Sequence, residues 1–314
     1  MGDSGLRIFG DIDSVQQRRN VALTIGNFDG VHLGHLHVIE TLRSQSGGLP
    51  LVVLTFDPHP SVLLSSKQAK QPLQSLNSRV EMLLQNGIDA VVVQDFSEEF
   101  SRLSADQFIC DYLLPKFSIK CAVLGFDFCY GARRSGDWSH FETHAHRYGF
   151  QALRATPFLI DGQPVSSSRI RTAILEHDFE NVERLLGRPF TLEGVVVKGD
   201  QRGRLIGFPT ANLGLDPGVG TVLPFGVYAV EVFLPGENLP RIGVMNCGVR
   251  PTFAEGLKLQ IETHIIGFSG DIYGCSVSFS VKKFIRPEMK FAGIDDLKSR
   301  IAIDVQLARS FFGV

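Results

Sequence analysis

The segment Gly26-Asn27-Phe28-Asp29-Gly30-Val31-His32-Leu33-Gly34-His35 decides how the first half of this chain folds. It follows an apolar, β-rich run at residues 21–25 and precedes a stretch in which Leu36, Ile39 and Leu42 recur at helical spacing. The pattern predicts a strand, a tight glycine-containing turn and a helix that begins near Gly34. In an α/β unit of this kind, phosphates bind at the carboxyl end of the strand, against the amino terminus of the helix.

The rest of the first half repeats this alternation of strand and helix. Further strands are predicted at residues 51–56, 90–93 and 121–124, and helices at residues 77–85 and 105–114. The second helix opens with the capping box Ser104-Ala105-Asp106-Gln107. Strands that alternate with helices indicate a parallel sheet with helices on its faces, which is a Rossmann-like α/β fold.

The second half has a different rhythm. Apolar runs at residues 195–198, 227–233, 241–246, 259–266 and 276–284 are separated by turns rich in glycine and proline. Evenly spaced strands without intervening helices predict a small antiparallel β-barrel. A terminal helix follows, in which five apolar residues lie near one face: Ile294, Leu297, Ile301, Val305 and Ala308. The helix breakers at Gly187-Arg188-Pro189 divide the chain into predicted domains 1–186 and 187–314.

Bulk composition narrows the class of partner. The chain has 314 residues, 44% of them hydrophobic, and a net charge of −2 with acids and bases interspersed. This balance provides no basic field for nucleic acid, and no apolar stretch reaches the length of a signal peptide or a membrane span. None of the five cysteines forms a Cys-x-x-Cys pair. We therefore expect a cytoplasmic protein with small-molecule partners, and neither a nucleic acid nor a membrane among them.

The two histidines of the opening segment are candidate phosphate ligands. His32 and His35 are three residues apart, so they share a face on a helical turn. Each imidazole can donate a hydrogen bond to a phosphate oxygen as negative charge develops there. Gly26 and Gly30 would let the backbone approach a nucleotide closely. The alternative is that the histidines are helix caps or surface residues, and a zinc site lacks a third ligand at suitable local spacing.

Three more segments in the first half follow strands or open a helix. Thr55-Phe56-Asp57-Pro58-His59-Pro60 follows the second strand, and Gly125-Phe126-Asp127-Phe128-Cys129-Tyr130-Gly131 follows the fourth. Ser166-Ser167-Ser168-Arg169-Ile170-Arg171 opens a further helix, where hydroxyls, backbone amides and Arg171 could hold phosphates. Taken alone, His59 is equally a turn residue, and the serines an ordinary N-cap.

The second half carries a glycine- and arginine-rich loop, Gly199-Asp200-Gln201-Arg202-Gly203-Arg204-Leu205-Ile206-Gly207-Phe208-Pro209-Thr210-Ala211-Asn212. Its glycines permit a close phosphate-wrapping backbone, and its arginines could screen phosphate charge. Thr210 and Asn212 share a face on an extended chain and offer hard oxygen ligands for Mg²⁺. A glycine-rich hairpin with a Thr/Asn turn is the alternative.

These motifs resemble two enzyme families in order along the chain. The opening segment resembles the His-x-Gly-His signature of the nucleotidyltransferase superfamily, in its flavin adenylyltransferase branch, and residues 166–171 resemble that superfamily's Ser-Ser-Thr-x-Ile-Arg motif. Pro209-Thr210-Ala211-Asn212 resembles riboflavin kinase, as do segments around Asn246, Glu262 and Arg286. Cys129 departs from the pattern, because a polar or basic residue is expected there. The whole chain is similar to bifunctional bacterial riboflavin kinase and FAD synthetase.

The resemblance implies a set of site residues in the first half. The implied ATP ligands of the adenylyltransferase are Gly26, Asn27, Phe28, Asp29, Gly30, Ser168 and Arg171, with His32 and His35 as catalytic groups and His59 and Asp127 on FMN.

It also implies a set in the second half. The kinase would bind ATP through Gly199, Arg202, Gly203, Arg204, Gly207 and Pro209, Mg²⁺ through Thr210 and Asn212, and flavin through Arg250, Arg286 and Glu288. Glu262 is the implied general base, because a primary hydroxyl needs a proton acceptor; an exposed strand carboxylate is the alternative. The expected cofactors are Mg²⁺ and ATP as co-substrate, with riboflavin and FMN as substrates and FMN and FAD as products.

Three other functions remain open at this point. One alternative is that only one of the two activities is retained, for example a kinase alone with an adenylyltransferase weakened at Cys129. The chain could instead be a non-catalytic flavin-binding regulator. It could also transfer a nucleotidyl group to another acceptor, such as a pantetheine or nicotinamide phosphate.

Overall fold

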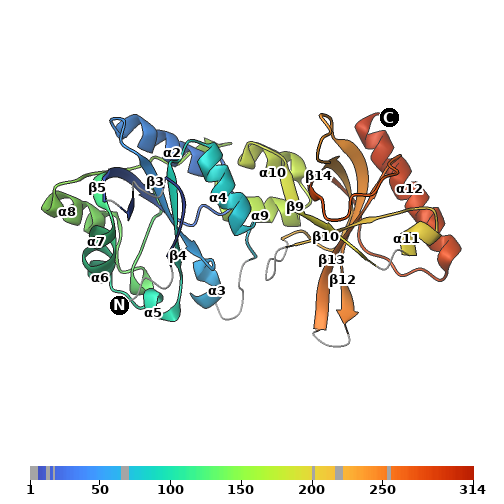
Figure 1. Cartoon of the computed structure of the whole chain (residues 1–314), viewed down its shortest axis with the longest axis horizontal. Coiled ribbons are helices and arrows are strands. Elements are labelled where there is room, and N and C mark those ends of the chain that lie inside the picture. The colour runs from blue at the N-terminus through green and yellow to red at the C-terminus, as the bar shows by residue number, and fades with distance from the viewer. Residues whose placement is uncertain are drawn as a thin grey trace. The chain divides into compact units, whose positions relative to one another are not determined.

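The computed structural model describes residues 6–11, 15–16, 18–64, 71–199, 202–215, 222–252 and 256–314 (Figure 1). Within these ranges, the side chains of Arg202 and Arg250 are not described. Residues Asp200 and Gln201 of the glycine-rich loop fall in the gap between residues 199 and 202. The chain divides into two compact units, Met1–Ser167 and Ser168–Val314. The functional boundary after residue 186 stays a prediction, since the two helices between residues 167 and 186 group with the second unit.

A six-stranded sheet forms the centre of the first unit. Its strands are β1 (Leu6–Gly10), β2 (Asn20–Ile25), β3 (Leu51–Asp57), β4 (Ala90–Asp95), β5 (Ser118–Leu124) and β6 (Gln151–Arg154). They lie in the order β1-β4-β3-β2-β5-β6, and all pairings are parallel except that of the edge strand β1 with β4. The predicted α/β fold is confirmed, although the sequence patterns did not reveal β1 or β6.

Helices cover both faces of this sheet (Figure 1). Helices α2 (Leu33–Gln45) and α4 (Leu76–Gln85) pack on one face through side chains that include Ile39, Leu42 and Leu83. The other face carries α6 (Ala105–Gln107), a π-helical segment (Phe108–Leu113), α7 (Leu114–Lys116) and α8 (Trp138–Tyr148). Shorter elements are α3 (Pro60–Leu64), α5 (Glu98–Ser101), a 3₁₀ turn (Ala132–Arg134) and the hairpin β7 (Leu159–Ile160) and β8 (Gln163–Pro164).

The helix predicted at residues 105–114 is present but is not a regular α-helix. Its capping box is complete: the Gln107 N–H donates to the Ser104 hydroxyl at 3.1 Å, and the Ser104 N–H donates to Gln107 Oε1 at 2.9 Å. The chain then widens into the π-helical segment. Pro115 has no N–H to donate to the carbonyl four residues earlier, which interrupts the regular ladder near this point.

The order of the strands places the opening segment at a switch point. From β2 the chain crosses to β3 on one side, whereas β5 lies on the other side. Ligands of open α/β sheets bind outside the carboxyl ends of the strands at such a reversal. The loop from Gly26 to His32 leaves the carboxyl end of β2 there.

A closed barrel forms the centre of the second unit. Its strands are β9 (Phe190–Val197), β10 (Ala211–Gly214), β11 (Gly226–Phe233), β12 (Arg241–Thr252), β13 (Gly256–Ile265) and β14 (Ser276–Arg286). They close in the order β10-β13-β12-β11-β14-β9, and every pairing is antiparallel. The predicted barrel is confirmed, and β10 is the strand that the apolar patterns missed.

Three longer helices and one short helix among the described residues complete the second unit. They are α9 (Ser167–Leu175), which begins at the last residue of the first unit, α10 (Phe179–Leu186) and the terminal α12 (Ile294–Phe312); a short helix, α11 (Arg202–Leu205), lies in the glycine-rich loop. The Phe179 ring of α10 meets the ring of Tyr228 edge-on at 5.8 Å between centroids. Among the described residues, no helix is long and apolar enough to cross a membrane.

A buried ion pair holds α12 on the barrel. The Arg286 guanidinium at the end of β14 donates to Asp304 from Nε at 3.0 Å and from Nη2 at 2.8 Å, and the Asp304 side chain is only 2% exposed. Ala308 of the predicted apolar face is buried, and Val305 packs beside it, but Ile294 is exposed. The apolar face of α12 is therefore narrower than the spacing predicted, and a carboxylate occupies its centre.

We expect Asp304→Asn to lower the free energy of unfolding of the second unit by about 3 kcal/mol, because it leaves the buried Arg286 charge unpaired. Hydrogen exchange at the amides of α12, with calorimetry of the whole chain, would measure the loss. Asp296→Asn makes the same chemical change at an exposed position in the first turn of α12 and should cost at most about 1 kcal/mol. Equal losses in the two variants would show that the ion pair does not hold the helix.

Candidate active sites

The loop between β2 and α2 has an unusual backbone. Phe28 and Val31 have positive φ angles of 49° and 35°, and Gly30 has a φ of 87° between them. A positive φ is a marked outlier for a β-branched residue such as Val31. Strain of this kind persists only where the surroundings hold the chain in place, and it concentrates at functional sites. The Phe28 ring and the Val31 methyl groups are buried, and this packing holds the loop in place.

Arg79 of α4 holds this loop from behind. Its guanidinium donates to the Asn27 carbonyl at 2.8 Å and to the Phe56 carbonyl at 3.0 Å, so it joins the carboxyl ends of β2 and β3. Burial lowers the pKa of Arg79, and the charges of Asp29 and Asp57 oppose that shift. The sequence patterns did not predict this role of Arg79, because they do not show whether an arginine in a helix is buried or exposed.

Asp29 is fixed at both its side chain and its backbone. Its carboxylate accepts a hydrogen bond from the Leu73 N–H at 2.8 Å, and its carbonyl accepts one from the Ser167 hydroxyl at 2.9 Å. Asp29 is almost fully buried. Its carboxylate therefore organises the loop, and the assignment of Asp29 to ATP stays a prediction that rests on its backbone.

His32 and His35 lie together at the start of α2. His32 is the N-cap: its Nδ1 accepts a hydrogen bond from the His35 N–H at 3.3 Å. The two rings stack with centroids 3.6 Å apart, and the Phe28 ring lies 5.1 Å from His35. Because Nδ1 of His32 accepts a hydrogen bond, the ring proton of the neutral imidazole is on Nε2. His32 therefore caps α2 through Nδ1, the capping role that the sequence left open.

Gly34 of the signature is required by close packing. A Cβ at this position would lie 3.0 Å from the Val165 carbonyl oxygen and 3.1 Å from the His32 ring. These separations are shorter than ordinary van der Waals contact, so a side chain here would require the carbonyl or the imidazole to shift by a few tenths of an ångström. The glycine of the His-x-Gly-His pattern thus keeps the His32 ring in position.

Two of the other predicted residues, His59 and Asp127, lie on loops at the carboxyl ends of β3 and β5, which flank β2, whereas Ser168 and Arg171 lie on α9. His59 follows β3, and its Nδ1 accepts a hydrogen bond from the Ser61 N–H at 3.1 Å. Asp127 follows β5 and is exposed, whereas Cys129 is half-buried. Ser168 and Arg171 lie in the first turns of α9, where Ser168 is exposed and Arg171 is half-buried.

In the barrel, strand register brings the predicted kinase residues together. Glu262 on β13 lies opposite Asn212 on β10 and opposite Asn246 on β12. Gln260, two residues before Glu262 on the same face, donates from Nε2 to Asn212 Oδ1 at 3.1 Å and to Glu262 Oε1 at 2.5 Å. The contacts of Gln260 were not predicted, although its spacing from Glu262 places both residues on the same face of the strand.

The glycines of the glycine-rich loop pack closely around Thr210 and Asn212. A Cβ on Gly199 would lie 2.4 Å from Nδ2 of Asn212, and one on Gly203 would lie 2.3 Å from the Phe208 carbonyl oxygen. Gly207 has a φ of 88°, which favours glycine. The side chain of Arg204 is exposed, while that of Arg202 is outside the described part.

His264 has a structural role. Its Nδ1 donates to the Pro209 carbonyl at 2.8 Å and so holds the residue before Thr210 against β13. The pattern of alternating residues on β13 places His264 and Glu262 on the same face, and this could have predicted the contact.

The predicted flavin residues of the barrel lie at its β12–β14 side. The Glu288 carboxylate lies directly on Gly248, where a Cβ would be 2.0 Å from Oε1. Burial, with a smaller effect from Glu288, raises the pKa of the Cys247 thiol to about 12. Arg286 is held by Asp304, and the backbone of Arg250 pairs with Lys258 across β12 and β13. Assignment of these three residues to flavin stays a prediction.

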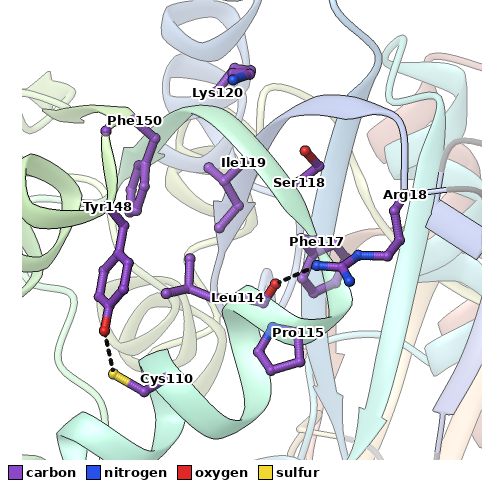
Figure 2. Close-up of a pocket in the computed structure, with 11 residues that line it drawn as sticks. Arg18, Cys110, Leu114, Pro115, Phe117, Ser118, Ile119, Lys120, Tyr148 and Phe150 are labelled. Carbon is purple, nitrogen blue, oxygen red and sulfur yellow. Dashed lines mark hydrogen bonds between the residues drawn. The ribbon is translucent and has the colours of Figure 1, made fainter.

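A surface hollow of about 470 Å³ lies elsewhere on the first unit and is drawn in Figure 2. It is lined by the start of β5, by α7 and by the end of α8, including Ser118, Lys120 and Tyr148. Ser118 is the first residue of β5, so the hollow is at the amino end of that strand. None of the predicted site residues lines it, and nucleotides bind sheets of this type at the opposite, carboxyl end.

Comparison with known proteins agrees with both halves of this picture. A family model described as FAD synthetase matches residues 14–169, and one described as riboflavin kinase matches residues 186–312. A crystal structure of a protein from Streptococcus pneumoniae, described as a macrolide-efflux protein, is 29% identical, with a TM-score of 0.77 over 92% of this chain and 94% of that one.

Relatives that share the whole length carry one description, bifunctional riboflavin kinase/FMN adenylyltransferase. The relative from Escherichia coli K12 is 40% identical over 93% of both chains, and the relative from Haemophilus influenzae is 39% identical over 93% of this chain and 94% of its own. The relative from Bacillus subtilis is 37% identical over 95% of this chain and 94% of its own. The chain therefore belongs to the family of bifunctional riboflavin kinases/FMN adenylyltransferases.

Proposed function

We propose that the barrel phosphorylates riboflavin to FMN and that the α/β unit then adenylylates FMN to FAD, with ATP as the donor in both steps. The observation that carries the kinase assignment is the register that sets Glu262 opposite Asn212, with the glycine loop packed against the Asn212 side chain. A proton acceptor, oxygen ligands and a phosphate-binding backbone are thereby adjacent in one wall of the barrel.

In the kinase step, Glu262 acts as the general base. The primary hydroxyl of riboflavin attacks the γ-phosphorus of ATP, its proton passes to the Glu262 carboxylate, and the bond between the γ-phosphorus and the β,γ-bridging oxygen breaks. Gln260 donates to Glu262 Oε1 and so orients the carboxylate. The polar oxygens of Thr210 and Asn212 suit Mg²⁺, and Asn212 Oδ1 keeps a second lone pair beside the one that Gln260 uses. Bound there, Mg²⁺ would offset phosphate charge.

The adenylyl transfer needs no general base. The FMN phosphate is largely ionised near neutral pH, so its oxygen attacks the α-phosphorus of ATP directly and pyrophosphate leaves. Nε2–H of His32 donates to phosphate oxygens at the amino terminus of α2, where the helix dipole also favours negative charge. His35, stacked on His32, completes the donor face. Ser168 and Arg171 are proposed to bind further phosphate oxygens, and His59 and Asp127 to contact FMN.

The same proposal limits the partners of the chain. Its net charge of −2 argues against nucleic acid, so we propose that riboflavin, FMN and ATP are its ligands and that it acts in the cytoplasm.

Incubation of the protein with riboflavin, ATP and Mg²⁺ tests both activities together. Chromatography of samples taken over time should show FMN first and FAD later. Accumulation of FMN without FAD would leave a kinase alone.

We expect Glu262→Gln to slow riboflavin phosphorylation by about 10²-fold or more, because the substrate hydroxyl loses its proton acceptor. FAD formation from added FMN should be unchanged in the same preparation. Glu193→Gln, which alters an exposed carboxylate of β9, is the control and should leave both rates near those of the wild type. A Glu262→Gln enzyme that makes FMN at the full rate would remove Glu262 from the base role and leave it as an ordinary strand acid.

His32→Asn separates helix capping from catalysis. Asparagine is a good N-cap, so its side chain can still accept from the residue 35 N–H, but it cannot place a donor where Nε2 lies. FAD formation from FMN should fall by about 10²-fold while riboflavin phosphorylation continues. His37→Asn, on the same helix, is the control. Full FAD synthesis by His32→Asn would reduce the role of His32 to that of a cap.

Gly199→Ala tests the close contact in the phosphate loop. The added methyl group must displace the Asn212 side chain, so riboflavin phosphorylation should fall by about 10²-fold, as expected for a displacement of roughly 1 Å. Gly293→Ala in the same unit adds its methyl group in open space and should have no such effect on the rate. Circular dichroism checks that both variants are folded, and an unaffected Gly199→Ala enzyme would contradict the tight fit.

A further inference from the structure

Outside both candidate active sites, three polar side chains of the first unit converge on one point. Asp106 lies in the first turn of α6, and His140 and His144 lie one turn apart on α8. Asp106 Oδ1 is 3.3 Å from Nε2 of His140 and 3.1 Å from Nε2 of His144. One ligand atom from each residue lies within 4.8 Å of the other two. None of the three residues has a part in the proposed reactions.

The hydrogen bond at Nδ1 of His144 determines where the proton of that ring lies. Nδ1 of His144 is 3.0 Å from the His140 carbonyl, which can only accept, so Nδ1 carries a proton. The neutral ring then presents a lone pair at Nε2, directly facing the Asp106 carboxylate. Two electron-rich atoms this close require a cation between them, either a proton on Nε2 or a metal ion.

His140 also has a partner at Nδ1, although here the partner is a hydroxyl, which can donate as well as accept. Its Nδ1 is 2.6 Å from the Tyr130 hydroxyl, and burial raises the pKa of that hydroxyl, so the phenol stays neutral. Metal-bound histidines usually have the second ring nitrogen engaged in this way by a carbonyl or another polar group, which orients the ring and selects the tautomer. Both histidines of this cluster already have such a partner.

The spacing suits a tetrahedral metal ion. Bonds of about 2.0–2.1 Å from a tetrahedral Zn²⁺ place neighbouring ligand atoms roughly 3.3–3.4 Å apart. The two histidine–carboxylate distances are close to that edge length, and all three ligand atoms lie within 4.8 Å of one another. Histidines four residues apart on a helix are also a common metal-binding pair. The Asp106 side chain is 73% exposed, so water can reach a fourth position.

We propose that Asp106, His140 and His144 form a binding site for a divalent transition-metal ion of the Zn²⁺ class. Two imidazole nitrogens favour such an ion over Mg²⁺, which prefers oxygen ligands, so this site is distinct from the Mg²⁺ requirement of catalysis. Three protein ligands with water as the fourth make the site accessible to exchange with the solvent.

The position of the site suggests what the ion does. It ties α6 to α8, and through Tyr130 it reaches the loop that follows β5 and carries Asp127. That loop is closely packed: a Cβ on Gly131 would lie 2.7 Å from the Ala105 nitrogen, and one on Gly136 would lie 2.6 Å from the Tyr130 ring. A metal ion here would stabilise this face of the sheet and the loop that we assign to FMN.

The hollow of Figure 2 is next to the cluster but does not supply a ligand. Its Tyr148 hydroxyl points to the Cys110 thiol at 3.4 Å, one helical turn beyond His144 and Asp106 respectively. Because this thiol is engaged there, Cys110→Ser should not change metal affinity.

The test uses the full-length, tag-free protein after removal of metals with a chelator. Titration with Co²⁺ should give the intense visible absorption of a tetrahedral ion, saturate at one equivalent and be reversed by Zn²⁺; the melting temperature should rise with either ion. Tyr130→Phe should weaken binding by about tenfold, and Asp106→Asn and His144→Gln by more than that. Because Asp106 is exposed and its capping box does not use its side chain, Asp106→Asn should fold normally.

Two controls keep the result specific to this site. His146→Gln changes an exposed histidine of the same helix, and His32→Asn changes the other histidine pair; neither should alter the Co²⁺ spectrum. Absence of tetrahedral absorption in the wild type, or an unchanged spectrum in His144→Gln, would overturn the proposal. The cluster would then be an ion pair between Asp106 and protonated histidine. The enzymatic rates are not used, so failure here leaves the proposed function untouched.

Discussion

The buried guanidinium of Arg79 is the interaction on which the nucleotide side of this protein depends. It reaches from α4 to the carbonyls of Asn27 and Phe56 and so fixes the ends of two adjacent parallel strands. The loop that starts there contains two non-glycine residues with positive φ, which cost about 1–3 kcal/mol each. Two hydrogen bonds from a charged donor contribute about 1.5–3 kcal/mol each, a similar total. Arg79 can therefore hold a strained loop that its own sequence would not maintain.

The barrel positions its glycine-rich loop by close packing. Two glycines of this loop allow close contacts. A Cβ on Gly199 would clash with the Asn212 side chain, and a Cβ on Gly203 would clash with the Phe208 carbonyl oxygen. The polar groups are then aligned by neighbours on the next strand, with Gln260 between Asn212 and Glu262. In both units the geometry of the motif depends on its own glycines as well as on residues outside it, such as Arg79 and Gln260.

The sequence could predict the features that local patterns determine, but not those that depend on contacts between distant parts of the chain. Hydrophobic period and turn chemistry predicted β2, α2, the capping box and most barrel strands, because local burial determines these features. They missed β10, which has only four residues, and β1, whose pairing with β4 is a long-range choice. The inward direction of Arg79 and Asp304 was equally hidden, since each sits in a helix where a charged residue normally faces solvent. Asp106 and the two histidines meet only through folding, 34 and 38 residues apart in the chain.

The different proton requirements of the two reactions account for the different side chains of the two sites. A hydroxyl must lose a proton as it attacks, so the barrel needs a carboxylate near its oxygen ligands, and Glu262 is half-buried and oriented by Gln260. A phosphate monoester arrives already ionised and needs only donors. The one carboxylate of the first signature, Asp29, accepts from the Leu73 N–H and is almost fully buried, so it is occupied by the loop itself. In the proposed mechanism, the imidazoles of His32 and His35 are the groups that donate to phosphate, which suits a site whose task is to stabilise negative charge.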